Sequence, residues 1–432
     1  MQPAEKPDQQ GSLLVLAALA LPVGALAGLV GAMFRLALQY ADGWRDALIA
    51  QAHGAGLAGF FCVIGGCAAA ALIAAWLVRG FSPHASGSGI PHVEAVLSGQ
   101  LPHAPFNLVP VKFVGGVLAI GSGLALGREG PSVQMGASLA HLAGAAFRRN
   151  WPDRRALLAA GAGAGLAAAF NAPIAGAIFV LEELVRRFET RTAIAALGAS
   201  ATAIAVSRLL LGDVPDFVVD PLAFAGPQTT ALFYLLGVVA GFLVVASNGT
   251  LPGTLAPANR LGRWPVEARA GLIGAAVGVL AWFLPHLVGG GHEVAQSTLT
   301  GGGTLASLPL VFLLRFGLGA VSYAAQTPGG LFAPLLVVGA QLGLLFGLAC
   351  RLVLPGLDTP TVAFAVVGMA AFFTGVVRAE PPHQPLDIQD VLQRVASKPF
   401  TAPARNRRWA GRRAASAPAW PRSTPRASAA AW

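Results

Sequence analysis

The segment Gly127–Phe170 occurs a second time in this chain, as Gly330–Phe373, in register and without a gap. Identical residues recur at a constant shift of 334 − 131 = 203 positions. In the first copy they are Pro131, Gly136, Ala137, Leu139, Gly144, Ala146, Arg148, Gly165, Ala167, Ala168 and Phe170. In a long apolar chain, such a repeat predicts a transporter of two related halves, with its substrate site at their interface near the bilayer midplane.

Composition places this repeat in a membrane. Hydrophobic residues make up 55% of the chain, charged residues 11%, and the mean hydropathy is +0.65. A water-soluble domain needs more polar surface than this. Several apolar stretches have about the 20 residues that a spanning helix needs. They are Leu13–Leu38, Leu57–Val78, Leu232–Ser247, Leu272–Leu287, Leu308–Ala325 and Leu331–Leu354.

The charge of +10 does not indicate a nucleic-acid partner, because nearly all of it lies in the last part of the chain. Beyond Asp390 there are nine basic residues and no acidic one: Arg394, Lys398, Arg405, Arg407, Arg408, Arg412, Arg413, Arg422 and Arg426. The apolar body is therefore nearly neutral. Cys62, Cys67 and Cys350 lie in apolar stretches, so the sequence predicts neither a disulfide framework nor a metal site, and no cofactor.

Three short motifs share one form, in which glycines precede a proline and an apolar run. They are Gly87–Pro91, Gly127–Pro131 and Gly329–Pro334. Proline is favoured in the first turn of a helix, and glycine lets the backbone approach a ligand. Each motif thus predicts a helix N-terminus, whose unpaired N–H groups attract a small anion. The alternative is that each Gly-Pro pair only marks the end of a loop.

These motifs closely resemble the signatures GSGIP, GREGP and GxFxP of the CLC family of chloride channels and proton-coupled chloride exchangers. Further resemblance lies in Lys112, Ala169–Pro173, Glu182-Glu183 and Gly289–Glu293. It covers roughly Leu13 to Arg378. The resemblance implies an all-α polytopic membrane protein of two inverted structural repeats with broken, tilted helices. It also implies a homodimer in the cell inner membrane whose subunits each have a pathway.

Residue by residue, the resemblance assigns the anion to the Ser88 hydroxyl and to the backbone N–H groups of Leu331 and Phe332. The anion-binding set expected from the motifs is Ser88, Gly89, Ile90, Gly130, Leu331 and Phe332. Serine at position 88 favours chloride, since a proline there accompanies nitrate preference in the family. The alternative for Ser88 is an N-cap that binds its own helix.

Glu129 is the expected gate. An unpaired carboxylate among apolar segments is a functional hypothesis by default. Its anionic side chain can occupy a chloride site, and protonation would release it, which is also what the resemblance implies. The alternative is an ion pair with Arg128 or Lys112 at a helix end. The repeat places Glu129 opposite Phe332, so one half supplies a carboxylate where the other supplies amides.

Glu183 matches the inner proton-transfer glutamate of the family's exchangers, which its channels generally lack. From the residues alone, Glu182–Arg187 could instead be a solvated helix end with charge pairs four residues apart. Glu94 matches another family acid with a structural role. His92 departs from the glutamate usual beside GSGIP.

The second half departs from the family after Ala379, where Glu380-Pro381-Pro382 replaces the expected continuation. The family's second anion-coordinating side chain, a tyrosine near the C-terminal end of the membrane domain, is absent. None of Tyr40, Tyr234 and Tyr323 is in the matching place. The favoured explanation is translation in a shifted frame. The other is a real variant. The composition of the tail predicts disorder, and 386–398 could form an amphipathic helix on a membrane surface.

The expected organisation is a polar segment 1–12, a first membrane half 13–213, a linker 214–228, an incomplete second half 229–379 and a basic tail 380–432. The expected function is proton/chloride antiport with a glutamate gate, the partners being chloride, protons and the lipid bilayer. The alternatives are a passive voltage- or pH-gated chloride channel and an inactive membrane protein. An enzyme is not expected, because H-E-x-x-H and G-x-S-x-G do not occur.

Overall fold

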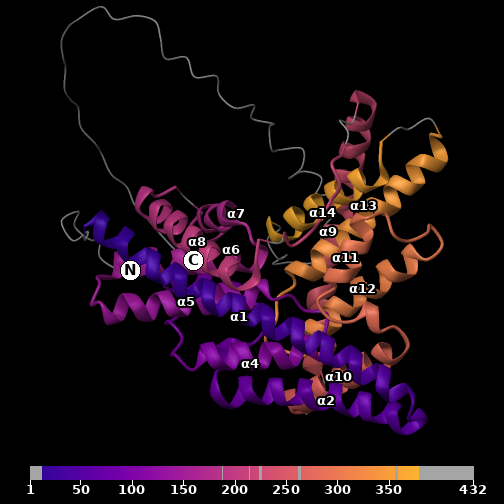
Figure 1. Ribbon diagram of the computed structural model, residues 1–432, viewed down its shortest axis with the longest axis horizontal. Coiled ribbons are helices and arrows are strands. Elements are labelled where there is room, and N and C mark those ends of the chain that lie inside the picture. The colour runs from indigo at the N-terminus through magenta and orange to yellow at the C-terminus, as the bar shows by residue number, and fades with distance from the viewer. Residues whose placement is uncertain are drawn as a thin grey trace, which may run out of the picture. The chain divides into compact units, whose positions relative to one another are not determined.

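The computed structural model describes residues 12–186, 188–213, 215–222, 226–260, 264–355 and 359–378. Across these ranges the chain forms α-helices and no β-strand, which confirms the all-helical fold (Figure 1). The predictions for the N-terminal segment, the shifted frame and the surface helix 386–398 lie outside the described residues. The boundaries of the two halves stay a prediction.

The helices before the linker include one long and several short ones. They are α1 (Leu13–His53), α2 (Gly56–Phe81), α3 (Ile90–Leu97), α4 (Leu108–Gly121), α5 (Glu129–Ala146), α6 (Trp151–Phe170), α7 (Pro173–Phe179) and α8 (Thr190–Leu211). Those after it are α9 (Pro227–Arg260), α10 (Val266–Phe283), α11 (His292–Leu299), α12 (Leu308–Tyr323), α13 (Phe332–Val353) and α14 (Thr361–Arg378).

Each copy of the sequence repeat folds into a pair of packed helices. The first copy gives α5 and α6, and the second gives α13 and α14, which lie side by side in Figure 1. The starting residues of α5 and α13, Glu129 and Phe332, are themselves 332 − 129 = 203 positions apart. The repeat in the sequence is therefore a repeat in structure.

Shared glycines let the two helices of each pair approach closely. A Cβ atom on Gly136 would collide with the backbone oxygen of Gly161, and one on Gly339 would collide with that of Gly368. A Cβ on Gly165 would likewise strike the Ser132 carbonyl. Small residues at helix contacts are the usual means of close packing in a membrane, where no hydrophobic force drives helices together.

Replacing Gly165 with alanine is expected to destabilise the fold by about 1–3 kcal/mol, the usual effect of overpacking. Thermal unfolding in detergent would measure this. Gly237→Ala is the matched control, because no atom lies within 4 Å of a Cβ at that position in α9. Equal melting temperatures for the two variants would contradict the account of helix packing.

Helices from before and after the linker also pack together. Figure 1 shows α2 beside α10, and a Cβ on Gly274 would lie 2.6 Å from the Cys67 carbonyl oxygen. Since the partners come from either side of the linker, the two groups of helices share one interface.

The described helices are long and apolar enough for a multi-pass membrane protein. Six qualify as candidate spans: Leu13–His53, Gly56–Phe81, Thr190–Leu211, Thr229–Gly249, Val266–Phe283 and Phe332–Val353. The predicted span Leu272–Leu287 is displaced, because α10 ends at Phe283 and a short 3-10 turn follows from Pro285. The predicted span at Leu308 is only 16 residues long as α12.

Candidate functional site

The three glycine-proline motifs meet at one place through backbone hydrogen bonds. The Gly127 N–H donates to the Gly330 oxygen at 2.6 Å, and the Gly330 N–H donates back to Gly127 at 2.8 Å. Gly87 receives a bond from the Gly329 N–H at 3.1 Å and donates to the Thr327 oxygen at 3.1 Å. The motif at Gly330 therefore joins the other two, although about 200–240 residues separate them.

All three motifs begin helices, as the sequence predicts. Helix α3 starts at Ile90, α5 at Glu129 and α13 at Phe332. Their prolines, Pro91, Pro131 and Pro334, lie within the first turns. The N–H groups of a first turn have no partner within the helix, so three helix ends direct donors into this region.

Ser88 does not cap its own helix. The N-cap of α3 is Gly89, in a left-handed conformation at φ 84° that suits glycine, and no side chain bonds the cap. The Ser88 side chain instead lies against Gly130, where a Cβ atom would collide with the hydroxyl. The N-cap interpretation of Ser88 is thus wrong. Its hydroxyl and the first turn of α5 are neighbours.

Lys112 holds the turn that precedes Ser88. This side chain is fully buried, and its Nζ donates to the carbonyl oxygens of Ala85 at 3.0 Å and Gly87 at 2.7 Å. A buried ammonium needs such acceptors, since its desolvation is otherwise costly. The lysine fixes the backbone on which Ser88 is mounted.

Glu129 is 3% exposed and lies beside the first turn of α13. A Cβ atom on Gly127 would strike Glu129 Oε2 and lie 3.1 Å from the Ala333 nitrogen, so the carboxylate is near the first turn of α13. Among the described residues, its Oε2 has no hydrogen-bond partner. The ion pairs left open by the sequence do not form there, because Arg128 contacts Asp216 and Lys112 contacts carbonyl groups.

Leu331 and Phe332 form the start of α13, as N-cap and first helical residue. The Phe332 ring packs edge-on against Phe373 at 4.8 Å between centroids and against Phe179 at 6.2 Å. The side chain is therefore a packing element, which leaves the backbone N–H groups to face the site.

Glu183 lies away from this cluster, in a π-helical turn at Val180–Leu184. Its side chain is half-buried, whereas that of Glu182 is exposed. Arg186, just beyond the turn, pairs with Glu94 of α3 at 2.8 Å. Helix α3 begins beside the other two motif helices and contacts Arg186 at Glu94. It therefore connects the surroundings of Ser88 to those of Glu183. π-turns occur frequently at functional sites.

Tyr323 is a site residue that sequence reasoning missed. Its hydroxyl lies against the backbone just before Ser88, where a Cβ atom on Gly87 would lie 3.0 Å from the phenolic oxygen. In the sequence, the one feature that could have pointed to Tyr323 is its position a few residues before Pro328 and the third motif. In the structure it is the last residue of α12.

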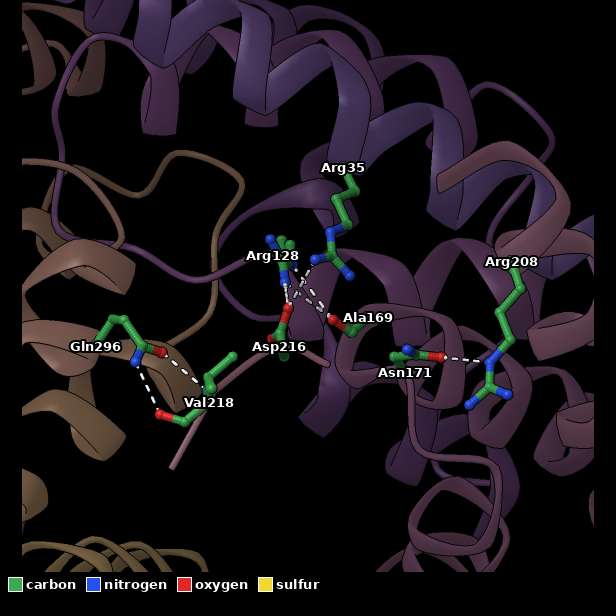
Figure 2. Close-up of polar contacts among 8 residues, drawn as sticks. All are labelled: Arg35, Arg128, Ala169, Asn171, Arg208, Asp216, Val218 and Gln296. Atoms are coloured by element: carbon green, nitrogen blue, oxygen red, sulfur yellow. Dashed lines mark hydrogen bonds and ion pairs between the residues drawn. The ribbon is translucent and has the colours of Figure 1, made fainter. Parts of the chain in front are cut away.

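A cavity of about 360 Å³ opens beside Glu129. Its wall includes Gly127, Arg128, Glu129 and Ala333 from the motifs, together with charged residues of α1, α11 and the linker. Figure 2 shows Arg128 and Arg35 directed toward Asp216 at this place. The cluster of helix ends is thus accessible to a small ion from one side.

The chain matches known proteins over most of its length. A model of the voltage gated chloride channel family matches residues 70–380. The H⁺/Cl⁻ exchange transporter ClcA of Vibrio cholerae is 38% identical over 371 residues, which cover 84% of this chain and 78% of that protein. ClcA of Vibrio parahaemolyticus is 36% identical over 376 residues, or 85% of this chain and 79% of that protein.

Solved structures have the same fold. The crystal structure of a slow cyanobacterial Cl⁻/H⁺ antiporter superimposes with a TM-score of 0.79 at 29% identity, covering 84% of this chain and 85% of that one. A CLC-type fluoride/proton antiporter has a TM-score of 0.70 at 24% identity and shows the fold alone. This protein belongs to the voltage-gated chloride channel family.

Proposed function

We propose that this chain exchanges chloride for protons across the cell inner membrane. The observation that carries the proposal is the convergence of three helix N-termini on a buried carboxylate, Glu129. Similarity to ClcA exchangers and to a Cl⁻/H⁺ antiporter structure supports it. The two-half organisation, the homodimer and the bilayer as partner belong to the same proposal.

In this proposal the anion lies among the Ser88 hydroxyl and the first-turn amides of the motifs. Gly89, Ile90 and Gly130 supply backbone at the starts of α3 and α5, and Leu331 and Phe332 supply it at the start of α13. Partial positive charge at each helix end attracts chloride without a full cation, so the ion is held but can leave.

Glu129 acts as the gate because its carboxylate and a chloride ion compete for the same donor. The carboxylate lies near the Ala333 nitrogen in the first turn of α13, next to the proposed anion ligands Leu331 and Phe332. Protonation would remove the negative charge and weaken this contact, freeing the helix end for an anion.

Glu183 is the second proton carrier, on a route that protons follow from Glu129 and chloride does not. Its half-buried position in a π-turn and the link from that turn to α3 through Arg186 and Glu94 support this role. Proton and anion routes then share Glu129 and diverge beyond it.

Replacing Tyr323 with phenylalanine is expected to raise the half-saturating chloride concentration roughly fivefold or more. The variant removes the polar group that lies against the Gly87 backbone, so the turn that carries Ser88 is held less firmly. Chloride dependence of flux measures the effect. Tyr234→Phe is the control, because Tyr234 is exposed on α9. An unchanged chloride dependence in Tyr323→Phe would remove the hydroxyl from the site.

Reconstitution of the purified chain in liposomes tests the function. Chloride efflux and external pH are recorded together, and an antiporter moves protons opposite to chloride. Chloride movement alone would favour the passive channel. Folded protein without flux would favour the inactive alternative.

A further inference from the structure

Two arginines from distant segments converge on a single carboxylate at the wall of the cavity. Arg35 Nη2 lies 3.1 Å from Asp216 Oδ1, and Arg128 Nη2 lies 2.5 Å from the same oxygen (Figure 2). Arg35 comes from α1, Arg128 directly precedes Glu129, and Asp216 lies in the linker between α8 and α9. Arg35 and Asp216 are each only 9% exposed.

The charges of this cluster are not balanced. Two guanidinium groups share one carboxylate, and Arg35 Nε has no hydrogen-bond partner in the described part of the chain. Guanidinium groups are well suited to anions because they present several donors in a fixed plane. A second anion could therefore use donors that Asp216 leaves unpaired, or could replace Asp216.

The third arginine of the cavity differs in this respect. Arg45 lies 2.6 Å from Asp42 and 2.9 Å from Asp46, so two carboxylates neutralise it. The remaining titratable groups of the wall are Glu129, Glu293, His286 and His292. The described wall carries five carboxylates and three arginines, so positive charge exceeds negative charge only locally, where Arg35 and Arg128 share Asp216.

The linker has fixed points besides Asp216. The next residues are fixed independently, since Val218 exchanges two hydrogen bonds with the Gln296 side chain, at 3.0 and 2.8 Å (Figure 2). Phe217 stacks on His292 with 5.2 Å between ring centroids. The position of the linker therefore does not rest on the Asp216 ion pairs alone.

We propose that Arg35 and Arg128 form an anion-binding site at the entrance to Glu129, and that Asp216 occupies it in competition with chloride. The inference rests on the proposed function for the identity of the anion. Asp216 is then a residue that sets how tightly the protein takes up chloride from the cavity. Removing its charge opens the arginine pair to the ion.

Asp216→Asn tests this, with bromide as the probe because its anomalous scattering locates it in crystals. At the same moderate bromide concentration, bromide should bind between the two guanidinium groups in the variant and be absent there in the unaltered protein, where Asp216 competes with it. The chloride concentration that half-saturates thermal stabilisation in detergent, at constant ionic strength, should fall about fivefold or more. No bromide between the arginines of the folded variant would overturn the proposal.

Asp213→Asn is the matched control. It changes the linker charge by the same amount, but Asp213 is exposed and pairs with Arg208 at 3.1 Å, outside the cavity. An equal gain in chloride affinity in both variants would mean a general charge effect and would also overturn the site. Adding Arg35→Gln to Asp216→Asn should reverse the gain, because the ion loses one of its two ligands.

If Asp216→Asn does not fold, the unaltered protein answers the same question. Soaking at the highest bromide concentration that preserves the fold should place bromide at the arginines and displace the Asp216 carboxylate. An Asp216 that keeps both arginines under that condition would contradict the competition. Because ion binding is measured in detergent, a protein that binds bromide but transports nothing would refute the proposed function and leave this site standing.

Discussion

Glu129→Ala is expected to abolish proton movement while some chloride movement continues. The variant lacks the carboxylate that lies near the Ala333 nitrogen, so no group remains there to carry a proton and the start of α13 stays open to anions. Removal of a positioned proton-transfer group lowers proton transfer by about a hundredfold or more. Parallel recording of chloride and pH in liposomes measures both fluxes.

Glu293→Ala is the control for this variant. Glu293 lines the same cavity and is exposed in the first turn of α11. Its loss removes the same charge from the cavity but leaves the start of α13 unchanged. Coupling should persist in Glu293→Ala. Proton movement that persists in Glu129→Ala would remove Glu129 from the role of gate.

The second large effect is expected at Glu183. Glu183→Gln keeps the size of the side chain but cannot take up and release a proton, so proton flux should fall by about a hundredfold or more while chloride flux continues. The same paired recording applies. The half-buried side chain sits in the π-turn at Val180–Leu184.

Glu182→Gln provides the comparison, because Glu182 is adjacent and exposed. It should transport both ions normally. If Glu183→Gln also moves protons at the normal rate, Glu183 is only a charge at a helix end and the proton route lies elsewhere.

The helix ends of this site could be predicted from the sequence because their cause is local. Proline is favoured in the first turn of a helix whatever the distant contacts are, and α3, α5 and α13 begin at the three motifs. The repeat likewise predicts two similar helix pairs, since the same glycines recur at their contacts. The glycine-proline pattern was sufficient to predict the helix starts, and the constant shift of 203 positions was sufficient to predict the repeated helix pairs.

Contacts between distant segments could not be predicted in the same way. Asp216 meets Arg35 across 216 − 35 = 181 residues of sequence, and neither residue belongs to a motif. The Tyr323 hydroxyl lies against the Gly87 backbone only because α12 ends beside the turn that Lys112 holds. The N-cap interpretation of Ser88 failed because Gly89 adopts a left-handed conformation and caps α3 itself.

The central claim is that chloride and proton movements are coupled, and a chloride gradient imposed on proteoliposomes tests it most directly. With the membrane potential clamped at zero, chloride flowing outward should drive protons inward against an opposing pH gradient. Only an exchanger can do this, since a channel lets each ion follow its own gradient. Chloride efflux without uphill proton movement, from folded and reconstituted protein, would contradict the account.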